Sequence, residues 1–319
     1  MELRQLRYFV AIVDHGSLSS AARVLHIAQP ALTQQIKQLE DELEAQLLHR
    51  SAQGVMATDA GKIFYEHAQA ILKQVGDAKS AVGQSTDNPT GTVALGIPQS
   101  ASGVLALPLL TAIRARYPEI SLQLTEELTG NLIEQLKTGR INLAVLFDDG
   151  QLTSFAAIPL VEEEMMFITR RDSHYADTQN AAPSSTSPSI TLGEAVKAPL
   201  ILPGRLHGVR PRIENIVRTM GLSIDNVIEI NSVTILKSAI LADIGATILP
   251  VAPLLLEIER GEMQAYRISD VALSRTLVLC ASKNIPLTNA AAAVERLVLE
   301  VAEALCSSGQ WRNAKTLTV

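Results

Sequence analysis

Residues 16–43 read GSLSSAARVLHIAQPALTQQIKQLEDEL, and this stretch decides the fold of the N-terminal region. Ser17 is predicted to cap a helix by accepting a backbone N–H. Pro30 is predicted to lie in the first turn of a second helix, because the N–H that proline lacks would be unpaired there. Aliphatic residues at helical spacing predict that the two helices pack together: Ala21, Ala22 and Leu25 in the first, and Leu32, Ile36, Leu39 and Leu43 in the second.

A third helix is predicted before this stretch, in LRQLRYFVAIVDHG, residues 3–16, where Gly16 ends it. Its buried stripe is predicted to contain Leu3, Leu6, Phe9, Val10 and Val13. The segment LLHRSAQGVMATDAG, residues 47–61, predicts two short extended pieces around Gln53 and Gly54, with Thr58 as the cap of the next helix. Three helices followed by a small β-wing predict a winged helix-turn-helix over residues 1–59.

The outward side of the helix that contains Pro30 carries residues suited to reading bases. With the aliphatic residues turned inward, the opposite side presents Gln29, Pro30, Thr33, Gln34 and Lys37. Glutamine donates and accepts hydrogen bonds at once, as the major-groove edge of adenine requires, and threonine offers a hydroxyl and a methyl for thymine. Three further side chains are placed to hold phosphates: Ser17, Arg50 and Lys62. The plainer alternative is a polar face that is only solvated.

The charge of this region is less basic than DNA binding usually demands. Residues 1–62 hold six cations and seven acids, a net charge of −1. The acids gather at residues 40–44, away from the start of the helix, and residues 17–39 carry only cations. We therefore expect few phosphate contacts and a shallow dependence of DNA affinity on salt.

Residues 60–88 are predicted to form a long linker helix. Its apolar residues step alternately by four and three, which keeps one seam facing a partner helix: Phe64, Ala68, Ile71, Val75, Ala78 and Val82. The seam predicts dimerisation, and the alternative is that the helix packs on its own domain. The turn-forming segment GQSTDNPTG, residues 83–91, marks a hinge to a second region.

From Thr92 onward, short aliphatic runs alternate with helical stretches, which predicts parallel strands with helices on both faces of a sheet. Strands are predicted at 92–98, 120–126, 141–147, 199–204, 226–230, 246–250 and 276–282, and helices at 102–116, 131–138, 209–220, 233–241 and 289–305. They form two regulatory subdomains joined by crossing strands: residues 92–163 with 267–306, and residues 164–266. A cleft between such subdomains is where small ligands bind.

The composition excludes several classes of protein. A hydrophobic share of 47% and a charged share of 19% are typical of a folded chain, and the longest apolar runs are too interrupted to span a membrane. Cys280 and Cys306 show no disulfide or metal spacing, and no signal peptide opens the chain, so the cytoplasm is the expected location. Because no nucleophile elbow, phosphate loop or dinucleotide fingerprint occurs, no catalytic residue, metal or cofactor is predicted.

Polar residues gather where the predicted cleft would open. Ser100 and Ser102 follow the first strand at the start of a helix, where free backbone amides favour an anion. Thr129 opens another helix, and LPGRLHG, residues 202–208, supplies Arg205 and His207 from the other subdomain. Arg205 is suited to pair with a carboxylate. Taken singly, each serine or threonine is also explained as a helix cap.

Several of these motifs together resemble a known family. Residues 16–43, followed by LLHR and TDAG, are similar to the winged helix-turn-helix of LysR-type transcriptional regulators, and the likeness continues through the linker helix and both subdomains. LHIAQPAL, QLLHR and TDAGK resemble the nitrogen assimilation control branch. The resemblance implies an α+β multidomain protein whose effector-binding region is periplasmic-binding-protein-like. It also implies a homodimer or homotetramer that dimerises near residues 60–86 and binds long, partly palindromic sites in double-stranded DNA.

The resemblance also implies functional residues. DNA contacts are expected at Gln29, Pro30, Thr33 and Gln34, with help from Arg50 and Gln53, and an inducer pocket at Ser100, Ser102, Thr129 and Pro203. Three positions depart from the family pattern. Glu44 and Asp243 stand at glycine positions, and Leu48 stands where phenylalanine is common. The Asp243 carboxylate is expected to alter what the cleft accepts, and some relatives work without a small inducer.

We therefore predict a sequence-specific DNA-binding regulator that is not an enzyme. Closure of the cleft on a small anionic metabolite is expected to change the geometry of the oligomer and hence the spacing of its half-sites. RNA polymerase is the expected partner beside the DNA, and no membrane partner is expected. Two alternatives remain. A periplasmic-type binding protein is disfavoured by the helix-turn-helix and the missing signal peptide, and an enzyme with an appended DNA-binding module lacks a catalytic cluster.

Overall fold

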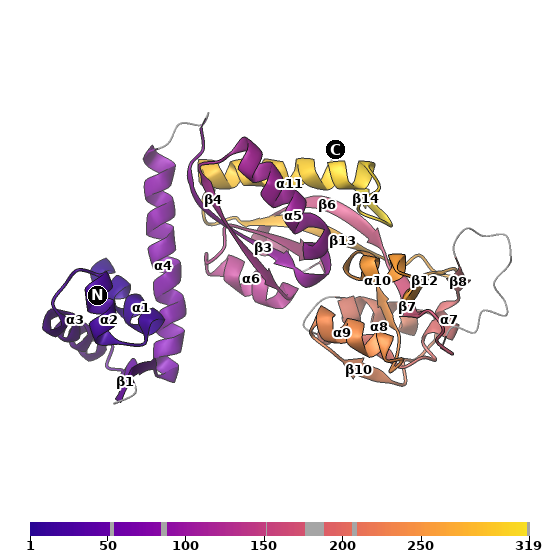
Figure 1. Ribbon diagram of the computed structural model, residues 1–319, viewed down its shortest axis with the longest axis horizontal. Coiled ribbons are helices and arrows are strands. Elements are labelled where there is room, and N and C mark those ends of the chain that lie inside the picture. The colour runs from indigo at the N-terminus through magenta and orange to yellow at the C-terminus, as the bar shows by residue number, and fades with distance from the viewer. Residues whose placement is uncertain (52–53, 84–87, 151, 176–187, 206–208, 318–319) are drawn as a thin grey trace. The chain divides into compact units, whose positions relative to one another are not determined.

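The computed structural model describes residues 1–319 except 52–53, 84–87, 151, 176–187, 206–208 and 318–319 (Figure 1). The chain forms two compact units. The N-terminal unit holds residues 1–83 with 138–140, and the C-terminal unit holds residues 84–137 with 141–319. No helix in the described part of the chain is long and apolar enough to cross a membrane.

The N-terminal unit begins with three helices, as predicted: α1 (Leu3–His15), α2 (Leu18–Val24) and α3 (Gln29–Glu42). Gly16 ends α1 in the left-handed conformation, with a φ of 61°. The Ser17 side chain accepts the Ser20 backbone N–H at 3.4 Å and so caps α2, and Pro30 lies in the first turn of α3. One apolar core joins the three helices and contains Phe9, Ile12, Leu32, Ile36 and Leu39.

Two of the predicted core residues are exposed. Leu3 is the first residue of α1 and is 41% exposed, and Leu43 is 36% exposed because α3 ends one residue before it. Ile12 takes the buried position in α1 that was expected for Val10 and Val13, which are only half-buried. The periodic pattern thus found the helices and misplaced residues at their ends.

The wing is an antiparallel hairpin of β1 (Leu48–Ser51) and β2 (Gly54–Ala57). Val55 donates its backbone N–H to Gly16 O at 2.8 Å, so the wing is held against the turn between α1 and α2. Gly54 is required there, because a Cβ atom would lie 2.7 Å from Gly16 O. Thr58 Oγ1 accepts the Gly61 backbone N–H at 2.9 Å and caps the next helix, as predicted.

The linker helix is α4 (Asp59–Gly83), and its apolar seam packs inside the N-terminal unit near one end and is exposed farther along. Near the start of the helix, the Phe64 ring meets the Phe9 ring edge-on with centroids 5.1 Å apart, and this contact lies inside the N-terminal unit. Farther along, Ile71 is 38% exposed and Val82 is 90% exposed. The predicted end of the helix at residue 88 falls past residues 84–87, which are outside the described residues.

The first lobe of the C-terminal unit contains a six-stranded sheet of order β14-β6-β13-β5-β3-β4. Its strands are β3 (Gly91–Pro98), β4 (Ile120–Glu127), β5 (Leu143–Phe147), β6 (Phe155–Glu164), β13 (Ser274–Ser282) and β14 (Ala314–Thr316). β3 is parallel to β4 and β5, as predicted, whereas β13, β6 and β14 pair antiparallel. α5 (Gln99–Arg116) and α11 (Asn289–Ser307) cover one face, and α6 (Thr129–Lys137) covers the other (Figure 1).

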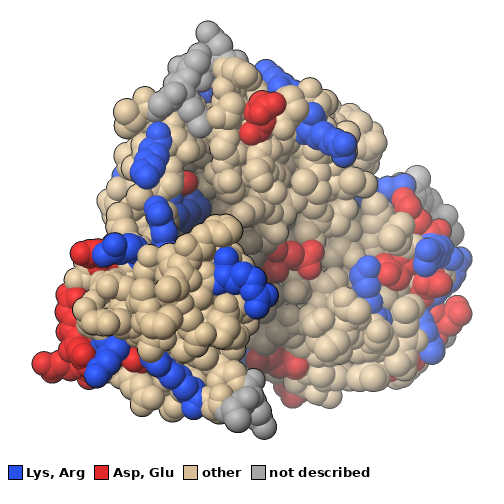
Figure 2. All heavy atoms as spheres, turned by 60° about the vertical axis from the view of Figure 1, so that its left-hand side comes forward, with Lys and Arg blue, Asp and Glu red and all other residues tan. Residues whose placement is uncertain are grey.

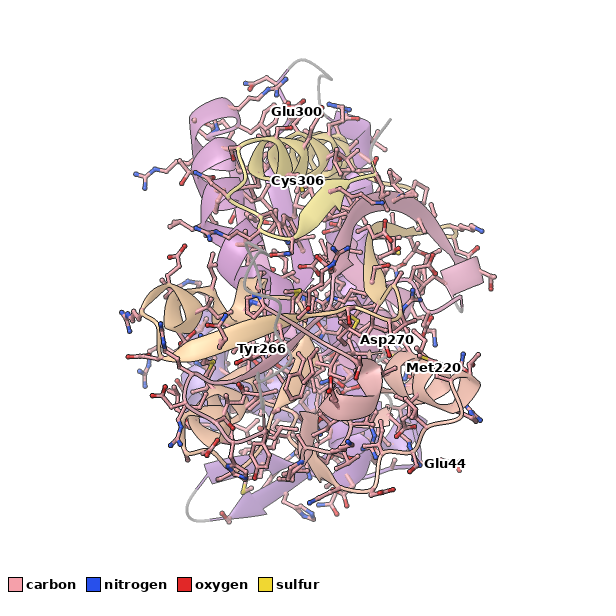
Figure 3. The ribbon with its side chains drawn as sticks, turned by 90° about the vertical axis from the view of Figure 1, so that its right-hand side faces the viewer. Glu44, Met220, Tyr266, Asp270, Glu300 and Cys306 are labelled. Carbon is pink, nitrogen blue, oxygen red and sulfur yellow. The ribbon has the colours of Figure 1, made fainter. Side chains whose placement is uncertain are left out.

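The second lobe contains two smaller sheets, a four-stranded one of order β11-β7-β12-β8 and a two-stranded one of β10 and β9. Its strands are β7 (Met166–Arg170), β8 (Ser189–Ile190), β9 (Leu200–Leu202), β10 (Val227–Glu229), β11 (Thr247–Leu249) and β12 (Met263–Ile268). Its helices are α7 (Leu192–Ala195), α8 (Val209–Thr219), α9 (Val233–Leu241) and α10 (Leu255–Glu259). In its core the rings of Phe167 and Tyr266 have centroids 6.3 Å apart, and Tyr266 is labelled on β12 in Figure 3.

The lobes are joined by the predicted crossing strands, since β6 leads into β7 and β12 leads back into β13. β12 stays in the second-lobe sheet through Ile268, two residues past the predicted border. β14 adds a strand to the first-lobe sheet after residue 306, where that subdomain was predicted to end. Trp311, between α11 and β14, is only 1% exposed and belongs to the core.

The two acidic residues at glycine positions adopt the conformation that glycine favours. Glu44 has a φ of 50° and Asp243 a φ of 58°. A residue with a Cβ atom is disfavoured in this left-handed region by about 1–2 kcal/mol, although aspartate tolerates it better than most. The family pattern therefore identified two positions where the backbone turn persists without glycine.

Candidate functional site

The outward face of α3 is open in the structure. Gln29, Pro30, Gln34 and Lys37 are exposed and Thr33 is half-buried, on the side opposite the buried aliphatic stripe. All five border one shallow concavity on the surface. α3 thus presents amide, hydroxyl and ammonium groups to solvent in a single row, and these are the groups that recognise base edges.

The first side chain of this face is held in place before any ligand arrives. Ser19 Oγ, on α2, donates to Gln29 Oε1 at 2.9 Å. Because the carbonyl oxygen of Gln29 accepts from Ser19, its amide N–H groups are left for an outside acceptor. The helix-turn-helix therefore orients the residue that starts its exposed face.

The predicted phosphate-binding residues are partly engaged within the unit. Ser17 is half-buried and its hydroxyl caps α2. Arg50 Nη2 lies 3.9 Å from Glu40 Oε2. Lys62 Nζ lies 2.8 Å from Asp59 Oδ1, and this hydrogen bond, with the charge of Lys62, lowers the pKa of Asp59. Gln53 lies outside the described residues.

Two acids of the 40–44 cluster have structural partners. Glu40 Oε1 accepts the backbone N–H groups of Leu47 at 2.8 Å and Leu48 at 3.1 Å, so it fixes the turn from α3 into the wing. Glu42 Oε2 lies 2.6 Å from the N-terminal amine of Met1. Figure 2 shows basic side chains standing singly on the face drawn rather than in one broad basic patch. The weakly charged surface agrees with the balance counted in the sequence.

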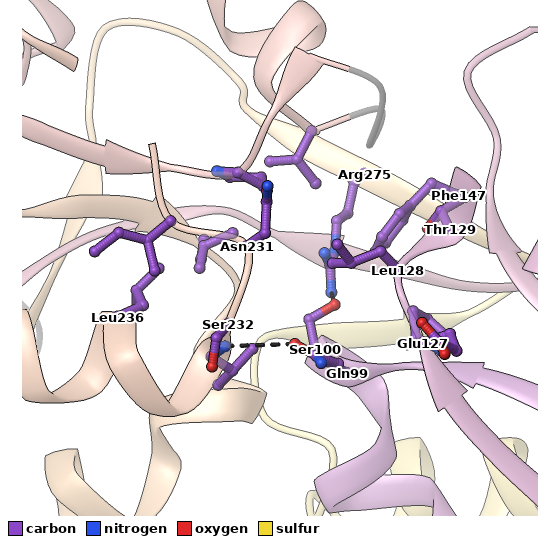
Figure 4. A pocket seen from close by; sticks show the side chains of 16 residues that line it. Gln99, Ser100, Glu127, Leu128, Thr129, Phe147, Asn231, Ser232, Leu236 and Arg275 are labelled. Atoms are coloured by element: carbon purple, nitrogen blue, oxygen red, sulfur yellow. Dashed lines mark hydrogen bonds between the residues drawn. The ribbon is translucent and has the colours of Figure 1, made fainter. Parts of the chain in front are cut away.

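A second candidate site is a cavity of about 50 Å³ between the two lobes of the C-terminal unit (Figure 4). Three helices begin at its wall: α5 at Gln99, α6 at Thr129 and α9 at Val233. The Val233 backbone N–H donates to Gln99 Oε1 at 3.4 Å and so links the two lobes there. Apolar side chains form most of the remaining wall, among them Leu128, Phe147 and Leu236. A cavity of this size holds a few water molecules or a small ligand.

Three of the five predicted effector residues line this cavity: Ser100, Thr129 and Pro203. Ser102 does not, because α5 begins at Gln99 and residues two apart on a helix point in different directions. Its hydroxyl donates instead to Gln99 O at 3.1 Å. Arg205 does not line the cavity either, because its exposed side chain pairs with Glu214, with Nε 3.1 Å from Oε2.

Asp243, another candidate from the sequence, does not line the cavity. The Asp243 carboxylate does not line it, since Oδ2 lies 3.0 Å from Arg170 Nη2 and 3.5 Å from His174 Nδ1 within the second lobe. Asp243 therefore does not contact the cavity directly, and its expected effect on what the cleft accepts stays a prediction. His207 lies outside the described residues.

Arg275 is a cavity residue that the sequence reasoning missed. It is 3% exposed, stacks on the Phe147 ring with its guanidinium carbon 4.0 Å from the centroid, and donates from Nη2 to Ser100 Oγ at 3.1 Å (Figure 4). Its Nε donates to Glu163 Oε2 at 2.7 Å. Burial lowers the pKa of Arg275, and the Glu163 carboxylate opposes that change. The available signal was a lone arginine at the start of the aliphatic run TLVLCAS.

Two buried polar atoms of the cavity wall have no hydrogen-bond partner among the described residues: Arg275 Nη1 and Thr129 Oγ1. An unsatisfied buried donor costs about 1–3 kcal/mol, so a native protein rarely keeps one without a use. Together with the three helix N-termini, these atoms make a small region that favours an acceptor with negative charge.

The cysteines provide no reactive site. Burial raises the pKa of Cys280 to about 12 and that of Cys306 to about 11, so both thiols are protonated at neutral pH. Within the described residues, no group of three or more His, Cys, Asp or Glu side chains is arranged to hold a metal ion.

Comparison with known proteins identifies the family of the chain. Residues 3–62 match the family described as "Bacterial regulatory helix-turn-helix protein, lysR family", and residues 86–303 match "LysR substrate binding domain". The nitrogen assimilation regulatory protein nac of Klebsiella aerogenes is 36% identical over 94% of this chain and 95% of its own length. The protein of the same name from Escherichia coli K12 is 34% identical over 98% and 99%.

A solved structure shares the fold over almost the whole chain. The crystal structure of full-length CbnR complexed with its target DNA has a TM-score of 0.67 and 21% sequence identity. The similarity covers 94% of this chain and 100% of that one.

Proposed function

This chain belongs to the LysR family of bacterial transcription regulators, and from that premise we propose how it reads DNA. It is a DNA-binding regulator and not an enzyme. In our proposal residues 1–59 are the DNA-binding domain, and α3 enters the major groove with Gln29, Thr33 and Gln34 against base edges and Pro30 beside them. The remaining contacts in this proposal go to the DNA backbone: Lys37 from the same face of α3, and Ser17, Arg50, Gln53 and Lys62 near the wing and the helix starts.

One observation carries this part of the proposal: the exposed side of α3 is rich in amides while the opposite side is fully buried. A solvated helix face would need neither the fixed Gln29 amide nor such uniform hydrogen-bonding capacity. CbnR, which shares the fold, is described in complex with its target DNA, and this supports the same role here.

The linker residues 60–88 are the proposed dimerisation element. Ile71 and Val82 are exposed on the seam, and apolar residues that repeat at coiled-coil spacing are stabilised by a partner helix. A two-fold dimer would place two copies of α3 on symmetric half-sites, and two dimers would cover a long operator as a tetramer. The protein would act in the cytoplasm beside RNA polymerase.

The C-terminal unit is the proposed sensor. In our proposal its two lobes are the regulatory subdomains, residues 92–163 with 267–306 and residues 164–266, and the cavity between them would bind a small anionic metabolite whose occupancy changes lobe closure. Support comes from the three helix N-termini and the unpartnered Arg275 Nη1 at the cavity wall. The names of the 34–36% identical relatives make genes of nitrogen assimilation the first targets to test.

The decisive experiment is a mobility shift with the protein's own upstream intergenic DNA and a scrambled duplex of equal length. The full-length protein should prefer its own site, and the double variant Gln29→Ala and Thr33→Ala should lose that preference by at least tenfold. Gln123→Ala, at an exposed glutamine of β4 in the C-terminal unit, is the matched control and should keep it. If the double variant binds with unchanged preference, α3 does not read the bases.

A further inference from the structure

Four side chains from distant parts of the chain form one continuous hydrogen-bonded path in the first lobe. Trp311 Nε1 donates to Glu163 Oε1 at 2.9 Å, and Glu163 Oε2 accepts Arg275 Nε at 2.7 Å. Arg275 Nη2 then donates to Ser100 Oγ at 3.1 Å, at the wall of the cavity. The path therefore leads from the C-terminal segment, through the sheet, to the cavity.

The centre of this path is a fully buried ion pair. The side chains of Arg275 and Glu163 are 3% and 0% exposed. A buried pair of this kind adds little to stability, because the cost of removing both charges from water offsets their attraction. Glu163 has both oxygens occupied, one by Trp311 and one by Arg275, whereas Arg275 keeps Nη1 without a partner among the described residues. The arrangement fixes the guanidinium and leaves Nη1 as a buried donor without a partner in a residue of the cavity wall.

We propose that Arg275 selects the ligand of this cavity by donating from Nη1 to the acidic group of a small monoanion, and that Glu163 and Trp311 position it. The Thr129 hydroxyl, which is also unpartnered, supplies a second donor to the same group. This inference rests on the proposed sensor role of the C-terminal unit and names the chemical class that the sensor accepts.

The charged groups around the cavity favour a ligand that carries one negative charge. Glu163 neutralises Arg275, so the pair alone does not demand an anion. The N-termini of α5, α6 and α9 each add a positive partial charge of roughly half an elementary unit at the wall. Glu127 also lines the cavity, with Oε2 accepting from Asn131 Nδ2 at 2.9 Å, and would repel a second negative charge. A monocarboxylate fits this balance better than a dicarboxylate or a neutral molecule.

The rest of the ligand is expected to be small and apolar. Leu128, Phe147 and Leu236 line the cavity, and its volume of about 50 Å³ suits a small ligand. A short aliphatic acid matches both the single acidic group and the apolar wall.

The positioning residue Trp311 lies outside the part of the chain that matches the family. The substrate-binding domain match ends at residue 303, and Trp311 follows α11 in the segment that forms β14. It is the only tryptophan in the sequence. The C-terminal segment is therefore part of the proposed sensor. The fluorescence of Trp311 would report a change in its hydrogen bond to Glu163, which also binds Arg275.

The test uses the full-length protein with acetate, propionate and isobutyrate, and with the corresponding amides, at constant ionic strength set by chloride. The acids should raise the melting temperature and shift the Trp311 emission at concentrations at least tenfold lower than the amides, because a ligand of the folded state stabilises it by mass action. If the amides act as well as the acids, or if neither has an effect, the inference fails. Failure of the wild-type protein to bind its operator would instead overturn the proposed function.

Variants separate recognition from folding. Thr129→Val removes an unpartnered hydroxyl, so the free protein should melt no lower than wild type while its affinity for propionate falls by about tenfold. Trp311→Phe keeps the ring, loses the Nε1 donor, and should reduce the ratio of acid to amide affinity. Ser223→Ala, at an exposed serine that does not line the cavity, is the matched control and should behave as wild type.

The double variant Glu163→Gln with Arg275→Gln keeps the interior neutral and should lose the preference for acids. If it folds and still prefers acids, Arg275 is not the selecting residue. If it does not fold, an undiminished acid preference in both Thr129→Val and Trp311→Phe would overturn the inference by itself.

Discussion

Ser19 Oγ, on α2, donates to Oε1 of Gln29, the first residue of α3, at 2.9 Å. The contact joins the two helices of the helix-turn-helix at the end of the face proposed to read DNA. It also sets which way the Gln29 amide is turned, since the carbonyl oxygen is occupied and the N–H groups are not.

Ser19→Ala should therefore weaken operator binding without touching the bases. Losing one hydrogen bond that orients Gln29 costs about 0.5–1.5 kcal/mol, so the dissociation constant should rise about two- to thirteenfold. Ser223→Ala, at an exposed serine of the second lobe that bonds Asp225 at 2.8 Å, is the control. Equal binding by Ser19→Ala and wild type in a fluorescence-anisotropy titration would show that Gln29 needs no orientation.

Lys37→Ala and Gln34→Ala should affect DNA binding in different ways. A lysine on a phosphate contributes about 0.9 to the slope of log affinity against log salt concentration, and a base-reading glutamine contributes none. Lys37→Ala should lower the slope by about that amount on every duplex, whereas Gln34→Ala should keep the slope and relax base preference. Titrations at four salt concentrations on operator and scrambled DNA measure both. A slope unchanged in Lys37→Ala would remove that residue from the phosphate contacts.

Glu44→Gly should stabilise the N-terminal unit. Glu44 has a φ of 50°, and glycine relieves the strain of about 1–2 kcal/mol while losing part of that gain to the greater entropy of the unfolded chain. We expect a net gain of about 0.5–1 kcal/mol in urea unfolding followed by circular dichroism. Asp41→Gly, in regular helix close by, is the control and should be destabilising by about 0.5–1 kcal/mol. A loss of stability in Glu44→Gly would contradict the argument.

The pH dependence of stability should reveal the contact between α1 and α4. Burial, followed by the hydrogen bond to Asp14, raises the pKa of Tyr65 to about 12, compared with about 10 in an unfolded chain. The folded state thus favours the protonated phenol. The stability due to this shift is complete below about pH 10 and is lost as the pH rises from there towards 12.

Tyr65→Phe should be less stable than wild type at pH 7 by about 0.5–1 kcal/mol, because Asp14 and Gln69 lose their shared hydrogen-bond partner. Its stability should also fall less steeply above pH 10. The difference between the stability curves of wild type and Tyr65→Phe cancels the contributions of Tyr266 and of the two cysteines. The pKa values of these three groups are also raised by burial. Parallel curves between pH 8 and 11 would show that Tyr65 titrates normally.

Ile71→Glu should weaken self-association. Ile71 is exposed on the α4 seam, so a charge there would be buried if the seam pairs with a second copy. Sedimentation equilibrium should show at least a tenfold higher dissociation constant for the variant. Ile63→Glu is the matched control, because Ile63 is 63% exposed on the same helix but lies off the seam. If both variants associate like wild type, the dimer forms elsewhere.

The helices of the N-terminal unit could be predicted because their signals are local. Gly16, Ser17 and Pro30 mark helix boundaries through bonds made within a few residues, and the structure has those boundaries. β6 could not be predicted in the same way. It contains Pro159, and its partner β13 lies over a hundred residues later, with a register shift between Leu277 and Val278 opposite that proline.

The residues of the cavity show the same limit of prediction from local sequence. Ser100, Thr129 and Pro203 were found because each starts a helix or ends a strand. Arg275 was missed because its meaning depends on Glu163, 112 residues away, and on Ser100, 175 residues away. A short sequence window contains none of these partners.

The pairing of β14 with β6 has a practical consequence for anyone who shortens this protein. A chain cut after residue 303, where the family match ends, would lose Trp311 and β14 and leave β6 as an uncovered sheet margin with free N–H and C=O groups. Such a margin is a template for strand addition between molecules, so the shortened regulator should aggregate. Residues 304–317 therefore protect the edge of the first-lobe sheet, at β6, from pairing with another molecule.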